Sequence, residues 1–177
     1  MSMIKGLIAD GPDTRLKENL SLFGQLVGDW EFQSERYFPG GRISKRTGEI
    51  HFGWILNGTA IQDVWIARLE KPMLGIPSTS FGTTIRFYDP VIDAWRITWI
   101  TPIGSLIQSF VARPVGDEII LEGKTADGQH FERWVISGIT PETCNWQSFE
   151  SRDHEQTWQL IHKLEARRVS SSAPQHE

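Results

Sequence analysis

Cysteine is nearly absent from this 177-residue sequence, since Cys144 is its one thiol. A single thiol excludes an internal disulfide and any cysteine-rich zinc site. No run approaches the roughly 20 consecutive apolar residues that a membrane-spanning helix needs. The amino end, MSMIKGLIADGPD, has one lysine and a broken apolar run that is too short for the apolar core of a signal peptide. These absences predict a cytoplasmic protein whose thiol stays reduced.

A large excess of charge of one sign is also lacking, and so are the common catalytic motifs. The formal net charge of -4 gives no strong attraction toward nucleic acid or an anionic membrane, so we expect neither as a partner. The run GKT at 123–125 ends like a phosphate loop, but Glu118 stands where the first glycine of that loop is needed. There is no G-x-S-x-G elbow and no glycine-rich dinucleotide fingerprint. His130 and Glu132 share one strand face without a third ligand, so we predict no metal site.

Tyrosine is scarce, whereas the other aromatic residues are abundant. The sequence has two Tyr but eight Trp and nine Phe. So many indoles in a chain of this length indicate either a very aromatic core or a large apolar pocket.

Short runs of alternating polar and apolar residues predict about ten strands. Turn residues separate most of them, such as PGG at 39–41, NG at 57–58 and DG at 127–128. Short connections make consecutive strands antiparallel neighbours, and closure of such a meander removes its edges. The prediction is an all-β, antiparallel, up-and-down barrel, with a β-sandwich as the alternative. The expected strands are 29–38, 43–54, 59–69, 81–88, 94–101, 105–113, 117–125, 128–137, 143–151 and 156–166.

One helix is predicted, over residues 12–27, where apolar side chains recur at spacings of three and four. We expect this short N-terminal helix to close one end of the barrel. Residues 12–168 would then form a single domain, 1–11 a flexible N-terminus and 169–177 a polar, disordered tail.

The stretch Gly28-Asp29-Trp30 follows the helix and begins the first strand. It resembles the G-x-W signature of the lipocalins and the wider calycin barrels. The resemblance implies that Trp30 closes the bottom of the barrel and that an arginine from the last strand packs across it. Our candidate for this arginine is Arg167, which is followed directly by Arg168.

Longer runs are similar to a bacterial lipocalin-like family of unknown function. They are GWILNGTAIQDVW at 53–65, GTTIRFYDPVIDAWRITWITP at 82–102 and RDHEQTWQLIHKLEARR at 152–168. The resemblance covers about residues 20 to 168 and implies a fold rather than a reaction. The paired cysteines of secreted lipocalins are absent here, so only the architecture carries over.

Alternation along the strands also suggests which side chains line a pocket. Counting from an inward Trp30 places Phe32, Ser34 and Arg36 inside, whereas the facing of the strands around Gln62 and Trp134 stays open. We expect apolar walls, with a few polar groups that orient the ligand. The predicted ligand-binding residues are Arg36, Trp54, Gln62, Trp99, Gln108, Trp134 and His162.

Two classes of function are compatible with such a pocket. The first is a carrier that holds a small hydrophobic or amphipathic molecule, for which an inward Arg36 would suit a carboxylate or phosphate group. The second is an isomerase, cyclase or hydrolase with His162 as acid or base, or a haem-binding barrel resembling the nitrobindin type, with His162 as the iron ligand. A barrel filled by its own indoles would instead work through its surface, as a homodimer or with a partner. The sequence names neither a cofactor nor a catalytic residue.

Overall fold

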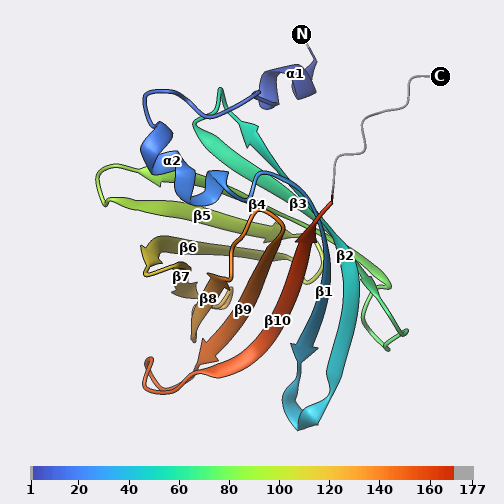
Figure 1. Ribbon diagram of the computed structural model, residues 1–177. Coiled ribbons are helices and arrows are strands. Elements are labelled where there is room, and N and C mark those ends of the chain that lie inside the picture. Colours follow the sequence, from blue (N-terminus) through green and yellow to red (C-terminus); the bar gives the residue numbers. More distant parts are fainter. Residues whose placement is uncertain (1, 170–177) are drawn as a thin grey trace, which may run out of the picture.

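The computed structural model describes residues 2–169 and contains a closed antiparallel barrel of ten strands (Figure 1). Consecutive strands pair with each other, and β1 also pairs with β10, which closes the ring. The predicted up-and-down barrel is therefore confirmed. The strands are β1 (Gly28–Tyr37), β2 (Ile43–Ile55), β3 (Ala60–Leu69), β4 (Thr79–Asp89), β5 (Ala94–Thr101), β6 (Leu106–Val115), β7 (Glu118–Lys124), β8 (Phe131–Ser137), β9 (Thr143–Ser151) and β10 (Gln159–Arg168).

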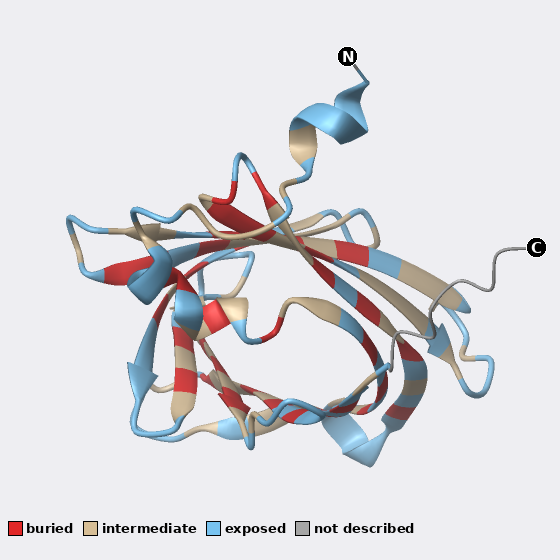
Figure 2. Ribbon diagram, turned by 45° about the horizontal axis from the view of Figure 1, so that its top comes forward, coloured by how far each residue is buried: buried red, intermediate tan, exposed pale blue. Residues whose placement is uncertain are grey.

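Side-chain alternation along each strand separates the inside of the barrel from its surface. On β1, Trp30, Phe32 and Ser34 are buried, whereas Glu31 and Gln33 are exposed. Figure 2 shows this alternation as buried bands along the strands. The inward face that was counted from Trp30 is thus confirmed for Phe32 and Ser34, whereas Arg36, farther along the same face, is exposed.

Two strands begin three residues later than predicted because an aspartate shapes the preceding turn. Before β8, the Asp127 carboxylate accepts hydrogen bonds from the Thr125 hydroxyl at 2.6 Å and the Gln129 amide at 3.0 Å. Before β10, Asp153 accepts one from the Thr157 amide at 2.9 Å. Aspartate side chains that bond to nearby backbone in this way favour turns over strands.

The helix is shorter than the predicted 12–27, since α2 spans Lys17–Gly24. Its start is delayed because the Asp13 carboxylate accepts hydrogen bonds from both the amide and the guanidinium of Arg15, which forms a turn ahead of the helix. At its other end the Leu26 amide bonds the carbonyl three residues back, at 3.0 Å, which tightens the chain into a turn.

The two chain ends differ in how much is described. Residues Met3–Leu7, within the segment that we expected to be flexible, form the short helix α1, and the Leu7 carbonyl accepts a hydrogen bond from the Leu56 amide. Of the predicted tail, 169–177, all but Val169 lies outside the described residues. Neither this helix nor α2 is long and apolar enough to cross a membrane, and residues 2–169 contain no helix that is.

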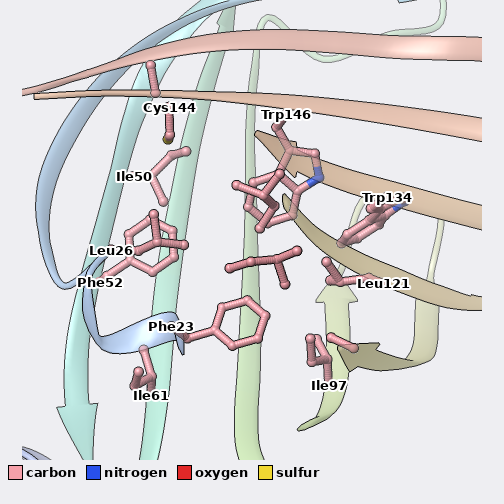
Figure 3. Packing of buried hydrophobic residues seen from close by; sticks show 14 of the residues in the cluster. Phe23, Leu26, Ile50, Phe52, Ile61, Ile97, Leu121, Trp134, Cys144 and Trp146 are labelled. Atoms are coloured by element: carbon pink, nitrogen blue, oxygen red, sulfur yellow. The ribbon is translucent and has the colours of Figure 1, made fainter. Parts of the chain in front are cut away.

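Helix α2 covers one end of the barrel and fills it with apolar side chains. Leu20, Phe23 and Leu26 are fully buried. The Phe23 ring meets Trp95 edge-on, with ring centroids 4.8 Å apart. Figure 3 shows Phe23 reaching from the helix into the apolar cluster that includes Ile97 on the barrel wall. The helix therefore closes this end, as predicted.

Trp30 completes the closed end and holds an arginine against it. Its indole is 1% exposed and donates its N–H to the Leu26 carbonyl at 2.8 Å. The guanidinium carbon of Arg168 lies 4.2 Å from the Trp30 ring centroid, within the range of a cation–π contact. The same guanidinium donates to the carbonyls of Val27 at 2.6 Å and Gln25 at 2.8 Å. One side chain thus joins the last strand to the helix exit.

The arginine over Trp30 is Arg168 rather than Arg167. Alternation along β10 explains the difference, because Ala166 faces inward and Arg168 follows it on the same face, which leaves Arg167 exposed. Gly28 also fits this contact, since a Cβ there would lie 2.4 Å from Nη1 of Arg168. Its φ of +129° is likewise a conformation that side chains other than glycine rarely adopt.

Candidate ligand-binding cavity

A cavity of about 320 Å³ lies inside the barrel, and every strand except β7 contributes to its wall. Phe38, from the turn between β1 and β2, and Ile103, from the turn between β5 and β6, belong to its lining. Successive strands alternate in direction, so β1 and β5 run the same way and end at the same end of the barrel. Both turns therefore lie at the end opposite α2 (Figure 1). The cavity therefore opens at the uncapped end.

Small side chains on the inward face leave the space for this cavity. Ser34, Ala67, Ser80 and Ser148 all line it. Gly82 lines it too, and a Cβ there would lie 2.1 Å from the ring of Trp99. The glycine thus allows the Trp99 ring to approach the strand closely, and large aromatic groups share the interior with open space.

Four indoles in the wall form a closed cycle of edge-on contacts. Trp65 contacts Trp99 and Trp146, with ring centroids 5.8 and 5.3 Å apart. Trp134 contacts the same two indoles, at 6.3 Å from Trp99 and 5.6 Å from Trp146. Figure 3 shows Trp134 and Trp146 side by side. We call these four residues the indole cycle; it presents flat apolar surface that a ligand body can cover.

Three nitrogen-bearing side chains come from adjacent strands on one side of the cavity. Arg36 on β1 is paired in register with His162 on β10, and Arg46 lies on β2. All three line the cavity. The Arg46 guanidinium donates a hydrogen bond to the Ser80 hydroxyl at 2.5 Å.

The imidazole of His162 is uncharged at neutral pH. Burial and the positive charges of Arg36 and Arg46 lower the pKa of His162 to about 4. Burial, together with the charge of Arg36, also lowers the pKa of Arg46. This side of the cavity therefore carries positive charge that discourages any further proton.

Glu132 on β8 is the one carboxylate among the lining residues, and two side chains donate hydrogen bonds to it. Glu132 is 9% exposed. It accepts hydrogen bonds from the Gln108 amide at 2.6 Å and from the Trp134 indole N–H, also at 2.6 Å. Neutral hydrogen-bond donors thus stabilise the Glu132 carboxylate. The cavity arginines, Arg36 and Arg46, lie on β1 and β2, away from β8.

Five of the seven predicted ligand-binding residues lie together in the lining. They are Arg36, Trp99, Gln108, Trp134 and His162. They come from five different strands, and the inward facing of Trp134 is one that alternation had left open. Their binding role stays a prediction.

The other two predicted residues lie outside the lining. Trp54 is two residues beyond the inward Phe52 along β2, which places it at the closed end, where its ring would lie 3.0 Å from a Cβ added to Gly24. Gln62 donates a hydrogen bond to the Thr83 hydroxyl at 2.9 Å, and its neighbour Asp63 is the buried residue of the two. Strand β3, whose facing the sequence left open, thus turns its odd-numbered residues toward the interior.

Several lining residues were missed in the sequence. Trp65 follows from the odd-numbered face of β3, and Trp146 and Ser148 from alternation along β9. Arg46 shares the even-numbered face of β2 with Ile50, both facing inward. Counting from the apolar positions of their strands would have found Arg46, Trp146 and Ser148, whereas Trp65 lies on the strand whose facing the sequence leaves open.

Comparison with known proteins supports the fold. No protein-family model matches the chain, and no curated protein matches it. The chain is similar to the S-type phycobiliprotein lyase CPES from Guillardia theta, with a TM-score of 0.56 and 10% identity over 90% of this chain and 99% of that chain. It is also similar to Rv2717c from M. tuberculosis, with a TM-score of 0.58 and 14% identity over 86% and 98% of the two chains. These structural similarities show a shared lipocalin-like barrel fold. At sequence identities this low, no activity follows from them.

Proposed function

We propose that this protein binds a small hydrophobic or amphipathic molecule inside the barrel. The observation that carries the proposal is a cavity of about 320 Å³ whose lining includes the indole cycle. Sites for small molecules have concave, mostly apolar walls with a few polar groups that fix orientation. Trp65 and Trp99 are the half-buried members of the cycle. Because their indole surfaces are flat, a ligand with a planar apolar body matches this wall best.

An enzyme that uses the same cavity is the second candidate. Its support is His162, a neutral imidazole that could accept a proton from a ligand. A catalytic histidine is commonly oriented by a hydrogen-bonded third group. Within residues 2–169, no carboxylate accepts a hydrogen bond from His162, and the charges acting on it are those of Arg36 and Arg46. We therefore favour binding over catalysis.

A haem ligand is the other role that a neutral histidine could fill. The visible absorption spectrum of freshly purified protein separates this alternative from the others. A haem band that is lost in His162→Ala would replace our proposal, whereas a colourless protein that binds an apolar probe supports it.

A cytoplasmic location belongs to the proposal. Burial raises the pKa of the single thiol, Cys144, to about 11, so its reactive thiolate form is scarce. An unreactive thiol and a chain without a second cysteine fit a reducing compartment.

The test is a titration with N-phenyl-1-naphthylamine, an uncharged fluorescent probe with a planar apolar body. We expect saturable binding to the wild type, with enhanced probe fluorescence. Ala67→Phe places a large ring in the cavity lining, so it should weaken probe binding at least about tenfold.

The matched control is Val64→Phe, which adds a similar ring to the same strand at an outward, 41% exposed position. It should leave probe affinity unchanged. Equal effects of the two substitutions, or no saturable binding to the wild type, would contradict the proposal.

A further inference from the structure

Two arginines in the cavity wall have no acidic partner. Several arginines of this chain pair with carboxylates, as Arg68 does with Glu49 and Arg133 with Glu122. Among residues 2–169, neither Arg36 nor Arg46 belongs to an ion pair. Arg36 is exposed, whereas Arg46 is half-buried. Burying a cation without a partner costs free energy, and an anion bound beside Arg46 would offset that cost.

The register of β1 and β2 brings these two guanidiniums together. Ser34 pairs with Arg46 and Arg36 pairs with Ser44, so the two arginines are diagonal neighbours on the inward face. Long side chains reach each other across such a diagonal. Burial and, after it, the charge of Arg36 lower the pKa of Arg46. Neighbouring like charges repel each other, and an anion bound between them would compensate that repulsion.

Hydrogen bonding positions one of the two arginines. The Arg46 guanidinium donates to the Ser80 hydroxyl, and that hydroxyl donates to the Ala67 carbonyl at 3.4 Å. Only one guanidinium nitrogen is used in this way, and the remaining N–H groups are available to a ligand. His162, beside Arg36, adds a neutral ring nitrogen to the same wall.

Charge elsewhere in the cavity sets the direction of the ligand. Glu132 lies on β8, three strands round the barrel from Arg36 in the order β1, β10, β9, β8. An anion is repelled by Glu132 and attracted by the two arginines, so it belongs on the β1 and β2 side. The apolar remainder of the ligand then contacts the indole cycle.

We infer that Arg36 and Arg46 form an oxyanion site, and that the ligand is an amphipathic anion with a planar apolar body and one carboxylate or phosphate group. Guanidinium N–H groups match the oxygens of both groups, and such charge-assisted bonds are stronger than neutral ones. This inference rests on the proposed function, and it adds the chemical class of the ligand and its orientation.

The experiment compares four ligands with one naphthalene body by calorimetric titration: naphthylacetate, naphthyl phosphate, naphthylethanol and naphthylethylamine. We expect the better of the two anions to bind at least about tenfold more tightly than the alcohol, and the amine to bind most weakly. The better anion identifies which oxyanion the site prefers. Because the comparison uses wild-type protein, it does not depend on any variant folding.

Variants then locate the site. Arg36→Gln and Arg46→Gln should each weaken binding of the anion about tenfold and leave the affinity for the alcohol within about twofold. The matched control is Arg113→Gln, which removes the same charge from an exposed position on the outside of β6. It should change neither affinity.

The outcomes separate the inference from the proposed function. If anion and alcohol bind equally and Ala67→Phe weakens both, the cavity binds ligands and the oxyanion site is refuted. If the anion is preferred but Arg113→Gln weakens it as much as Arg36→Gln does, long-range charge explains the preference and the site is also refuted. If no naphthalene compound binds, or if Ala67→Phe weakens none of them, the proposed function fails together with the inference.

Discussion

Single residues decide how each end of this barrel behaves. At the closed end, Arg168 stacks on Trp30 and bonds the carbonyls of Val27, Gln25 and Pro141. Gln25 and Val27 lie in the segment that follows α2, and Pro141 lies between β8 and β9. The Arg168 side chain thus joins the last strand to both of these segments. At the open end, arginines with no such partners face the cavity.

Replacing Arg168 should therefore cost stability, and replacing its neighbour should not. Arg168→Ala removes the stacked cation and its three carbonyl bonds, and we expect a loss of about 2 kcal/mol in the free energy of unfolding. Urea unfolding measures this loss. Arg167→Ala, at an exposed position, should stay within about 0.5 kcal/mol of the wild type. Equal losses in the two variants would show that Arg168 does not act as described.

His162 makes the stability of the fold depend on pH. Its pKa is about 4 in the folded protein, against an ordinary value of 6.5. Between these values the unfolded chain binds a proton that the folded chain refuses, so stability falls as the pH falls from about 6.5 to about 4. Below that range both states are protonated and the loss through this residue ends. We expect it to reach about 2 to 3 kcal/mol.

The measurement is the free energy of unfolding at several pH values for wild type and His162→Gln. Carboxylates that titrate in the same range are common to both proteins, so the difference between the two curves reports His162. This difference should change between pH 6.5 and 4 and be flat above pH 7. Parallel curves would mean that His162 titrates normally in the folded protein.

At the scale of elements, one buried ion pair joins β3 to β4. Asp63 and Arg86 are both fully buried and paired, and Asp63 also accepts the Thr84 amide at 3.0 Å. The guanidinium carbon of Arg86 lies 5.0 Å from the ring centroid of Phe23 on α2 and 5.1 Å from that of Phe52 on β2. The pair therefore contacts four elements at the closed end.

Removing one partner of this pair should destabilise the protein more than removing both. Arg86→Met leaves the Asp63 carboxylate buried without its cation, and we expect a loss of about 3 to 5 kcal/mol. Adding Asp63→Leu to that variant should recover most of the loss, because no buried charge then remains. Thermal and urea unfolding of the three proteins measure this. A double variant less stable than Arg86→Met would show that the pair itself supplies net stability.

The elements were more predictable from the sequence than the site was. Strands follow from period-two alternation, but the helix was overestimated because Asp13 and Arg15 form a local turn that apolar spacing does not reveal. The choice between Gln62 and Asp63 as the inward residue could not be made from the sequence, since burial of an aspartate requires its distant partner Arg86. The register between β1 and β2, which alternation along each strand does not specify, likewise makes Arg36 and Arg46 diagonal neighbours.

The whole molecule has one filled end and one hollow end. Helix α2, Trp30 and the buried ion pair fill the first, whereas small inward residues leave the second open. The eight indoles are divided between these roles. Trp65, Trp99, Trp134 and Trp146 belong to the cavity lining, and the other four lie outside it.

This division makes the central claim directly measurable by indole N–H resonances in nitrogen-15 NMR spectra during a titration with N-phenyl-1-naphthylamine. The four resonances of the indole cycle should shift with a common saturating profile. Those of Trp30, Trp54, Trp95 and Trp158 should stay in place and act as internal controls, because these residues do not line the cavity. Shifts confined to the control indoles, or none at saturating probe, would contradict ligand binding in the barrel.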